Sequence, residues 1–369
     1  MIAAVFYGVI PISGGFYKRS KWRRFRNRFD ELRLSPLLNY RQYRQLGNDG
    51  GVFRFTGELE SITGETLWVR GENLTIPVSL KKTKCFLLPI YEGETPETPE
   101  QIRWNRVSTI TDGAKVFIGG QIKNQNDRLN FCSTKENPLM VIFYNCPDSE
   151  LTSGIIRSAR ARNEYWNNFT MVSIAIGAIS LIYTAVSLLD RPALRLNVIG
   201  ALTAVFAPIL QSFPPSYLFT ILYRRMTWDA RNLRAYWDLA RLPMRFLQPE
   251  QESGILSTGE KYGFVKLDSL PDETTSGTIP FLIPEDAGKE RKQPWYFFGV
   301  LDGTSSLPQR SKDPFVSFGI LPTNPSLLVR RYAIRSYTLE VFAWLILLLG
   351  ICVNIIFIFI ILFLLGVIS

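Results

Sequence analysis

Four long apolar blocks interrupt a chain that is otherwise polar and rich in turn residues. They lie at 2–17, 169–189, 197–222 and 341–368, and none of them contains a charged residue. The last block runs for 28 residues from Val341 to Ile368. About 20 apolar residues in a helix are enough to cross a hydrocarbon core of about 30 Å. The pattern therefore predicts an integral membrane protein.

The first block is the shortest of the four, and it contains Pro11 and the pair Gly14-Gly15. A span this short crosses a bilayer only if the bilayer thins around it. The basic cluster follows the block instead of preceding it, which argues against a secretory signal peptide. We expect the block to span the membrane, with a half-inserted anchor as the alternative.

The polar region after the first block begins with a basic amphipathic segment at 18–48. Its residues Trp22, Phe25, Phe29 and Leu32 recur at spacings of three or four, which places them on one face of a helix. We expect this face to pack on the β module that follows. The alternative is that it lies along the membrane surface.

Short alternating runs with polar turns between them fill the rest of this region and predict a small barrel or sandwich without an internal helix. The predicted strands are Val52–Leu59, Thr66–Arg70, Leu74–Leu80, Cys85–Leu88, Lys115–Ile122, Arg128–Cys132 and Leu139–Tyr144. The residues expected in the core are Phe53, Phe55, Trp68, Val116, Ile118 and Ile142.

The second polar region predicts a basic helix followed by a smaller and looser β module. Its predicted strands are Gly263–Leu267, Thr278–Ile283, Trp295–Leu301 and Phe315–Ile320. The predicted fold class is an α+β membrane protein with about four transmembrane helices and two cytoplasmic, mainly-β modules. The expected order is a short transmembrane helix at 1–17, the basic segment at 18–48, β module 1 at 49–168, transmembrane helices at 169–189 and 197–222, a basic helix with β module 2 at 223–340, and a last transmembrane helix at 341–368.

Similar strings recur in the same order in both halves and predict an internal duplication. The matched pairs are Tyr17-Lys18-Arg19-x-x-Trp22 with Tyr223-Arg224-Arg225-x-x-Trp228, Val116–Gly119 with Tyr296–Gly299, Lys135–Pro138 with Lys312–Pro314, and Pro147, Arg157 and Trp166 with Pro325, Arg335 and Trp344. Both copies enter and leave the cytoplasm in the same direction, so the repeat is expected to be parallel. The alternative is convergent composition, because Tyr, Trp and Arg favour membrane edges.

Lys and Arg near the apolar blocks fix the expected orientation. Seventeen of them flank the two polar regions, whereas only Arg191 and Arg195 lie in the turn between the second and third blocks. Cytoplasmic loops carry the excess of positive charge. We therefore expect an integral protein of a cytoplasmic membrane, such as the bacterial inner membrane, with both modules in the cytoplasm.

The net charge of +10 follows from this crowding of basic residues at membrane edges, where each gains about 1 kcal/mol from anionic headgroups. Lipid headgroups, not nucleic acid, are the expected partner of these charges. The expected membrane-interface anchors are Tyr17, Lys18, Arg19, Trp22, Arg157, Trp166, Tyr223, Arg224, Arg225, Trp228, Arg335 and Trp344.

The composition excludes several kinds of chemistry. The chain has no histidine, so His-dependent triads and His-containing zinc sites are impossible. Its four cysteines, Cys85, Cys132, Cys146 and Cys352, are scattered and are expected to be buried thiols in a reducing compartment. Phosphate-binding glycine loops and the GxSxG motif are missing from the sequence. We expect no catalytic residue, no metal and no cofactor.

One stretch resembles a known family. Asp112–Ile122, continuing through Arg160 and Trp166 into the second apolar block, is similar to the GIDE-type module of membrane-anchored ubiquitin ligases. The resemblance implies a β module held close to the membrane. Those ligases also carry a RING built from Cys and His, which this chain does not have. The resemblance therefore implies the architecture without ligase activity.

Three functions remain after this comparison. The first is a non-catalytic membrane scaffold whose modules bind protein partners or other copies through exposed strand edges. The second is a small transporter or channel component, for which Pro208, Pro214 and Pro215 in the third block are the main signal. The third is a membrane-associated enzyme that would use Glu58 and Glu60, although a solvated strand face explains both carboxylates. We favour the scaffold.

Overall fold

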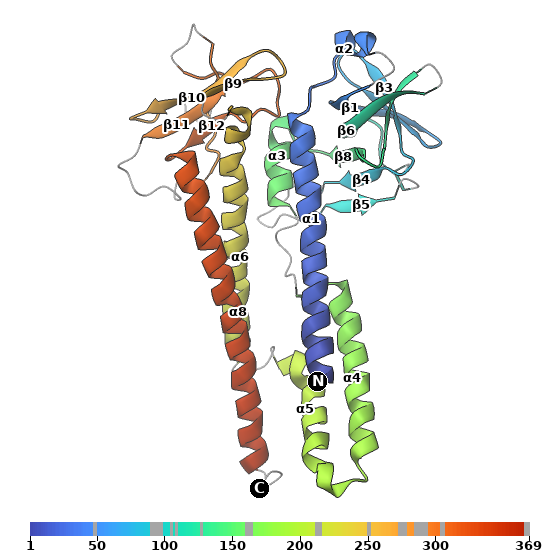
Figure 1. Cartoon of the computed structure of the whole chain (residues 1–369), viewed down its shortest axis with the longest axis vertical. Helices are drawn as coiled ribbons and strands as arrows, with labels where there is room; N and C mark the ends of the chain where they lie inside the picture. The colour runs from blue at the N-terminus through green and yellow to red at the C-terminus, as the bar shows by residue number, and fades with distance from the viewer. Residues whose placement is uncertain are drawn as a thin grey trace. The chain divides into compact units, whose positions relative to one another are not determined.

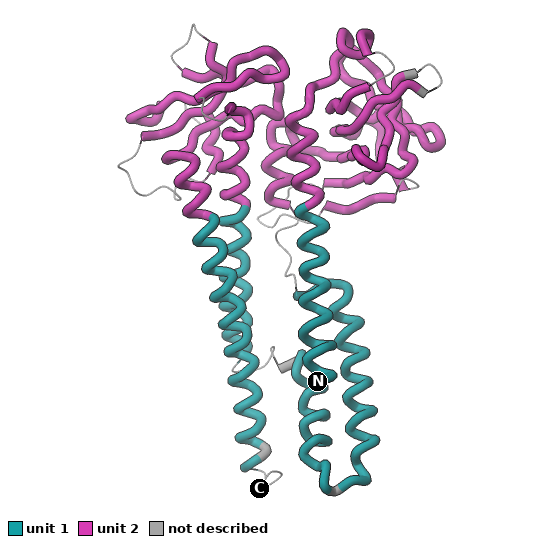
Figure 2. The backbone as a smooth tube through the Cα atoms, in the orientation of Figure 1, with its two compact units in different colours: residues 1–23, 162–234, 333–369 teal, residues 24–161, 235–332 magenta. Residues whose placement is uncertain are grey.

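The structure is a computed structural model and describes residues 1–46, 50–88, 99–103, 106–107, 110–125, 128–158, 165–210, 216–248, 252–271, 279–283, 294–302 and 307–364. The chain divides into two compact units (Figure 2). One contains residues 1–23, 162–234 and 333–369, and the other contains residues 24–161 and 235–332. We call them the helical unit and the β unit. Helices α1, α6 and α8, whose bounds are given below, contribute residues to both.

A five-stranded barrel forms the first half of the β unit (Figure 1). Its strands pair in the order β1-β2-β3-β7-β6, and β6 pairs with β1 to close the ring. Only β3 and β7 are parallel. The return of β6 to the side of β1 makes a Greek key. The strands are β1 (Val52–Thr63), β2 (Thr66–Arg70), β3 (Thr75–Ser79), β6 (Lys115–Gln125) and β7 (Arg128–Cys132).

Three further strands extend the sheet from β6 in the order β8-β4-β5. These are β8 (Met140–Tyr144), β4 (Lys84–Leu87) and β5 (Glu100–Ile102). Two short helices accompany them, α2 (Tyr40–Gln45) and α3 (Asp148–Arg157). The seven predicted strands are confirmed. Of the two predicted architectures, a barrel or a sandwich, the structure has the barrel. The prediction missed β5 and both helices.

The alternation of side chains along the strands decides which of them reach the core. Phe55, Val116, Ile118 and Ile142 are buried, as predicted. Phe53 is only partly buried. Trp68 was wrongly predicted as a core residue: its neighbours Leu67 and Val69 are 0% exposed, and Trp68 points to the opposite face of β2 because successive side chains alternate.

The apolar face of α1 (Ile10–Leu34) packs on the barrel module, as the sequence predicted. The rings of Phe25 and Phe86 lie 4.4 Å apart, and those of Phe29 and Phe117 lie 5.1 Å apart. Leu32 sits so close to Gly119 that a Cβ at this glycine would lie 2.8 Å from its side chain. The close approach explains why β6 carries a glycine at this position.

A smaller four-stranded sheet completes the β unit in the order β12-β11-β10-β9. Its strands are β9 (Ser253–Ile255), β10 (Lys261–Leu267), β11 (Trp295–Val300) and β12 (Gly319–Leu321), preceded by the 3₁₀ turn η4 (Pro243–Phe246). The predicted strand at Thr278–Ile283 amounts to a single bridge at Phe281, with Thr278 outside the described residues. Of the predicted strand at Phe315–Ile320, only residues 319 and 320 lie in β12, and β9 was missed.

Strands β10, β11 and β12 of this sheet pair in the same order and register as strands β1, β6 and β8. Ile118 of β6 lies opposite Phe55 of β1, and Phe298 of β11 lies opposite Phe264 of β10. On their other edges, β6 and β11 pair antiparallel with β8 and β12. The fourth strand differs between the two sheets. The other neighbour of β1 is β2, which follows it in the chain, whereas the other neighbour of β10 is β9, which precedes it.

The parallel contact beside these ladders is also repeated. Phe86 of β4 pairs in parallel with Ile142 of β8, and Phe281 bridges in parallel to Ile320 of β12. Ile142 lies opposite Phe117, the residue before Ile118, and Ile320 lies opposite Phe297, the residue before Phe298. The two isoleucines therefore occupy the same place in their ladders.

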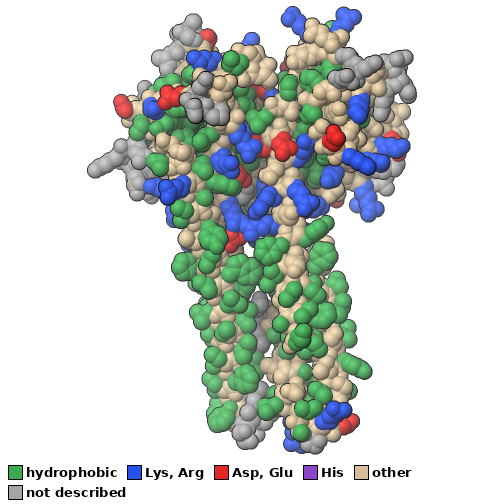
Figure 3. Space-filling view, in the orientation of Figure 1, with side chains coloured by type: hydrophobic (Ala, Val, Ile, Leu, Met, Phe, Trp, Pro, Cys, Tyr) green, Lys and Arg blue, Asp and Glu red, His purple; other side chains and the backbone are tan. Residues whose placement is uncertain are grey.

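Two helices of the helical unit are long and apolar enough to cross a membrane, namely Asn168–Leu188 and Pro325–Ile361. Hydrophobic side chains, with few charged ones among them, make up much of the visible surface of the apolar helices (Figure 3). The third apolar block divides between two helices, the first ending at Leu210 and the second beginning at Ser216. The helices are η1 (Ala4–Val9), α4 (Asn168–Leu188), η3 (Pro192–Leu194), α5 (Arg195–Leu210), α6 (Ser216–Arg241) and α8 (Pro325–Leu364).

The first apolar block forms the π-helical segment η1 and the start of α1, and it packs on α4. Pro11 has no N–H, so the carbonyl of Tyr7 four residues earlier lacks its helical donor. The hydroxyl of Tyr165 donates to that carbonyl at 2.6 Å. Ser173 of α4 likewise donates to the carbonyl of Phe6. Side chains that satisfy freed backbone groups are how proline is tolerated in apolar helices.

Candidate functional site

Most of the predicted interface anchors lie on three helices of the helical unit. Four are on α1, four on α6 and two on α8, while Trp166 lies two residues before the start of α4. Arg157 is the exception, because it ends α3 in the β unit. In order, the anchors of the helical unit are Tyr17, Lys18, Arg19, Trp22, Trp166, Tyr223, Arg224, Arg225, Trp228, Arg335 and Trp344.

The aromatic anchors make related contacts in the two helix pairs. The ring of Tyr17 on α1 packs edge-on against Phe169 of α4, with 6.4 Å between centroids. Tyr223 on α6 packs against Trp344 of α8 at 5.9 Å and shares a buried cluster with Leu347. The structure thus brings Tyr223 and Trp344 together, whereas Trp166 is 41% exposed and contacts Tyr165.

One carboxylate joins three helices of the helical unit. Glu340 of α8 accepts from Arg19 of α1 at 3.1 Å and from Arg234 of α6. Their side chains are 21%, 19% and 26% exposed, respectively. The sequence analysis counted both arginines as membrane-edge charges but did not identify Glu340 as their partner.

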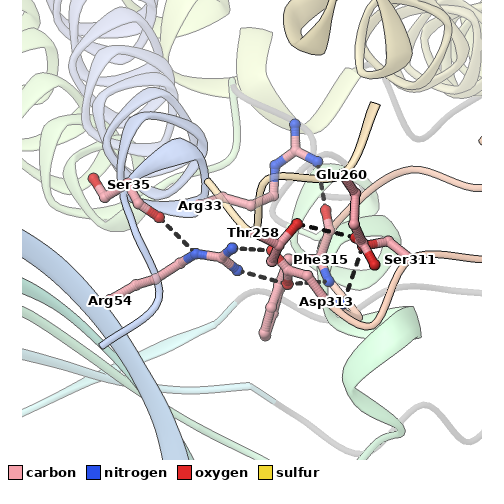
Figure 4. A network of polar contacts seen from close by, with 8 residues as sticks. All are labelled: Arg33, Ser35, Arg54, Thr258, Glu260, Ser311, Asp313 and Phe315. Carbon is pink, nitrogen blue, oxygen red and sulfur yellow. Dashed lines mark hydrogen bonds and ion pairs between the residues drawn. The ribbon is translucent and has the colours of Figure 1, made fainter. Parts of the chain in front are cut away.

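A buried ion pair lies in the β unit, where the barrel module meets the second sheet. Figure 4 shows Arg54 of β1 pointing at Asp313, which lies in the segment before β12. Arg54 donates to Asp313 Oδ1 at 3.0 Å and also to its Oδ2. Both side chains are 2% exposed. A two-pronged guanidinium–carboxylate contact is among the strongest polar contacts a protein makes.

The remaining polar atoms of this ion pair also have partners. Nε of Arg54 donates to the carbonyl of Ser35 at 2.8 Å. Asp313 Oδ1 accepts from the backbone N–H of Phe315, and the N–H of Asp313 donates to the hydroxyl of Ser311. A buried charge pair is stable only when its other donors and acceptors are satisfied in this way.

A second buried arginine crosses the same junction. Arg33, at the end of α1, is 1% exposed and donates to the carbonyl of Phe315 at 3.0 Å. It also donates to Asp30, and it lies over the ring of Phe246. Burial lowers the pKa of Arg33, although the carboxylate of Asp30 opposes that shift. We name Arg33, Arg54, Asp313 and Phe315, with the residues that hydrogen-bond to them, the module junction.

The apolar side of the module junction is aromatic. Phe315 packs between the guanidinium of Arg54 and the ring of Phe117, whose centroid is 5.4 Å away. Phe117 also touches Phe29 of α1, so helix, barrel and second sheet meet at this one ring. Asp30 pairs with both Arg33 and Arg245, and Asp313 pairs with Arg54, while Glu260 accepts from the hydroxyl of Ser311.

The sequence analysis missed this junction. It predicted the strand Val52–Leu59 without giving Arg54 a role, and it treated Asp313 only as part of a repeated string. The two residues are 259 positions apart, and a pattern within one strand carries no information about such a partner. The only available signal was the charge itself, set between Phe53 and Phe55.

Candidate chemistry is sparse in the described parts of the chain. Glu58, one of the carboxylates considered for an enzyme, pairs with Arg70 at 3.6 Å on the exposed barrel surface, and Glu60 is exposed beside it. Among the described residues, no group of Cys, Asp and Glu that could hold a metal ion comes together. The four cysteines are free, and Cys85 and Cys132 are buried as predicted. The prediction of a buried thiol was wrong for Cys146, which is partly buried, and for Cys352, which is exposed on α8.

The thiol of Cys85 should be protected from alkylation in the folded protein. It is 0% exposed, and burial raises its pKa to about 12. At pH 8 only about one such thiol in 10⁴ is ionised, and the thiolate is the reactive form. We expect maleimide to modify Cys85 at least 100-fold more slowly than a cysteine placed at exposed Glu72, with the difference abolished in denaturant. Equal rates in the folded protein would show that the barrel core is open.

A scan of the chain against models of known protein families found no match, and a search of curated proteins found no similar sequence. By its fold, this protein is an α+β chain with a five-stranded barrel, a second small sheet and two membrane-length apolar helices.

Proposed function

We propose that this protein is a non-catalytic membrane scaffold that presents two β modules to protein partners as one rigid body. The observation that carries the proposal is the module junction. An ion pair that is 2% exposed on both sides, with every further polar contact made within the chain, leaves the modules a single relative orientation. A fixed orientation reduces the freedom that a partner must freeze on binding.

The membrane part of the proposal comprises four spans, with both modules in the cytoplasm. It is supported by the two membrane-length helices and by the exposed apolar residues of α4 and α8. It is also supported by the hydrogen bond from Tyr165 to the carbonyl of Tyr7, which Pro11 leaves without its helical donor. The Lys and Arg distribution supports the orientation. The protein is therefore expected to stay in the membrane pellet after alkaline carbonate washing.

An internal duplication is part of the same proposal. The shared register of β1, β6 and β8 with β10, β11 and β12 supports it, and so does the repeated parallel bridge. Ile142 and Ile320 are 178 positions apart, as are Trp166 and Trp344. In this view the two modules derive from one tethered unit, and the second has lost the strands that close the barrel.

Purification in mild detergent from native membranes tests the scaffold function. We expect a defined set of proteins to co-purify with the intact chain, and to be lost from a variant in which Arg54 is replaced by methionine. Replacing the exposed Arg70 by methionine is the matched control and should retain the set. If the same proteins co-purify with all three chains, a fixed arrangement of the modules does not matter for binding.

A small transporter or channel component remains the second candidate. Its supporting observation is a proline in both proposed entry spans, Pro11 beside a π-helical segment in the first and Pro208 inside α5 in the third. Interrupted helices in corresponding positions of two repeats are typical of transport sites. Substrate-dependent flux into liposomes containing the purified chain would favour this candidate over the scaffold.

A further inference from the structure

The contact at Glu340 lies where the charged part of α8 gives way to its apolar part. Glu340 directly precedes the charge-free stretch that begins at Val341. Its two oxygens are taken up by Arg19 from α1 and Arg234 from α6. Two guanidinium groups on one carboxylate leave one positive charge in excess, and all three side chains keep part of their surface exposed.

The surroundings of this contact add positive charge. Arg23 is exposed one helical turn beyond Arg19 on α1. Among the described residues of the helical unit, the only other carboxylates are Asp190, in the turn between α4 and α5, and Asp229. Figure 3 shows Lys and Arg side chains gathered where the hydrophobic surface of the helices ends. Besides Arg191 and Arg195, which lie near that turn, the described cations of this unit are Lys18, Arg19, Lys21, Arg23, Arg224, Arg225, Arg231, Arg234 and Arg335.

Aromatic side chains accompany these charges. Tyr17 is 63% exposed and lies just before Lys18 on α1, and Trp166 is 41% exposed ahead of α4. Amphipathic rings of this kind favour the headgroup level of a bilayer. Excess positive charge next to apolar surface and exposed rings matches a ligand that has an anionic head and an apolar tail.

We propose that Arg19 and Arg234, which Glu340 holds in place, together with the exposed Arg23 bind the phosphate of an anionic phospholipid. The inference rests on the proposed membrane location and adds a specific lipid class to it. Guanidinium donors match phosphate oxygens in geometry, and their fork allows two parallel hydrogen bonds. Glu340 has two roles in this site: it orients two of the arginines, and it limits the net charge offered to the lipid.

Spin-labelled lipids in vesicles test the site in the full-length chain. The vesicles contain phosphatidylcholine with a trace of spin-labelled phosphatidylglycerol or phosphatidylcholine, and electron paramagnetic resonance gives the association ratio of the two. We expect a ratio above one for the wild type. Removing one positive charge with Arg19→Gln should lower the ratio roughly fivefold. Arg70→Gln, which removes an exposed charge from the barrel surface, should leave it unchanged.

Glu340→Gln separates lipid binding from a purely structural role. This substitution breaks the same contact as Arg19→Gln but increases the positive charge, so the ratio should rise. A fall in both variants, or no change in either, would overturn the lipid site. Failure of the proposed membrane location has a different signature, because the chain would then leave the vesicles on carbonate washing whatever its lipid preference.

Discussion

Replacing Arg54 by methionine is expected to lower the free energy of unfolding of the β unit by about 3–5 kcal/mol, because the change leaves the carboxylate of Asp313 buried without its partner. Asp313→Asn should produce a loss of similar size, since Arg54 then stays buried as an uncompensated charge. Thermal or denaturant unfolding in detergent, followed by near-ultraviolet circular dichroism, measures both changes.

Two controls make this prediction specific. The double variant Arg54→Met with Asp313→Leu should recover most of the loss, because apolar pairs replace buried ion pairs at little cost. Arg70→Met breaks the exposed pair with Glu58, in which the side chains are 63% and 53% exposed, and should cost less than about 1 kcal/mol. Similar losses at Arg54 and Arg70 would show that the module junction is open to solvent.

Phe117→Ala is expected to cost about 3–5 kcal/mol, the usual effect of removing a fully buried aromatic ring. The side chain is 0% exposed and packs against Phe29 and Phe315, so its loss opens a cavity shared by helix α1, the barrel and the second sheet. The midpoint of thermal unfolding should fall by about 10 °C.

Trp68→Ala is the matched control for Phe117→Ala. Trp68 is the larger residue and also lies on a barrel strand, but its side chain is only partly buried. We expect a loss of about 1 kcal/mol. If Trp68→Ala proved as costly as Phe117→Ala, the outer face of β2 would have to be covered by something other than the described residues.

Local patterns predicted the elements of the barrel well. The alternation in β1 and β6 placed Phe55, Val116 and Ile118 correctly in the core, because one face of each strand is buried. The same alternation places Trp68 on the face of β2 opposite to that of Leu67 and Val69, so the prediction of Trp68 as a core residue was wrong. The short strand β5 carries no alternation that a sequence pattern can detect over three residues.

Long-range features were beyond the sequence. The partner of Arg54 is set by the packing of two modules, and the sharing of Glu340 by Arg19 and Arg234 depends on three helices meeting. The third apolar block was expected as one helix, yet its residues divide between α5 and α6 around a stretch, 211–215, outside the described residues. The resemblance of 112–166 to the GIDE-type module stays a prediction from the sequence.

The most direct test of the account is the sidedness of the two modules, because a scaffold built on four spans requires both of them on one side of the membrane. Single cysteines are placed at Glu72 in the barrel module, at Lys261 in the second module and at Asp190 in the turn after α4, all exposed positions. A membrane-impermeant maleimide is applied to intact cells, and peptide mass spectrometry reads the labelled sites. The account predicts labelling at position 190 alone, with positions 72 and 261 labelled only after the membrane is permeabilised. Labelling of position 72 or 261 in intact cells would contradict it.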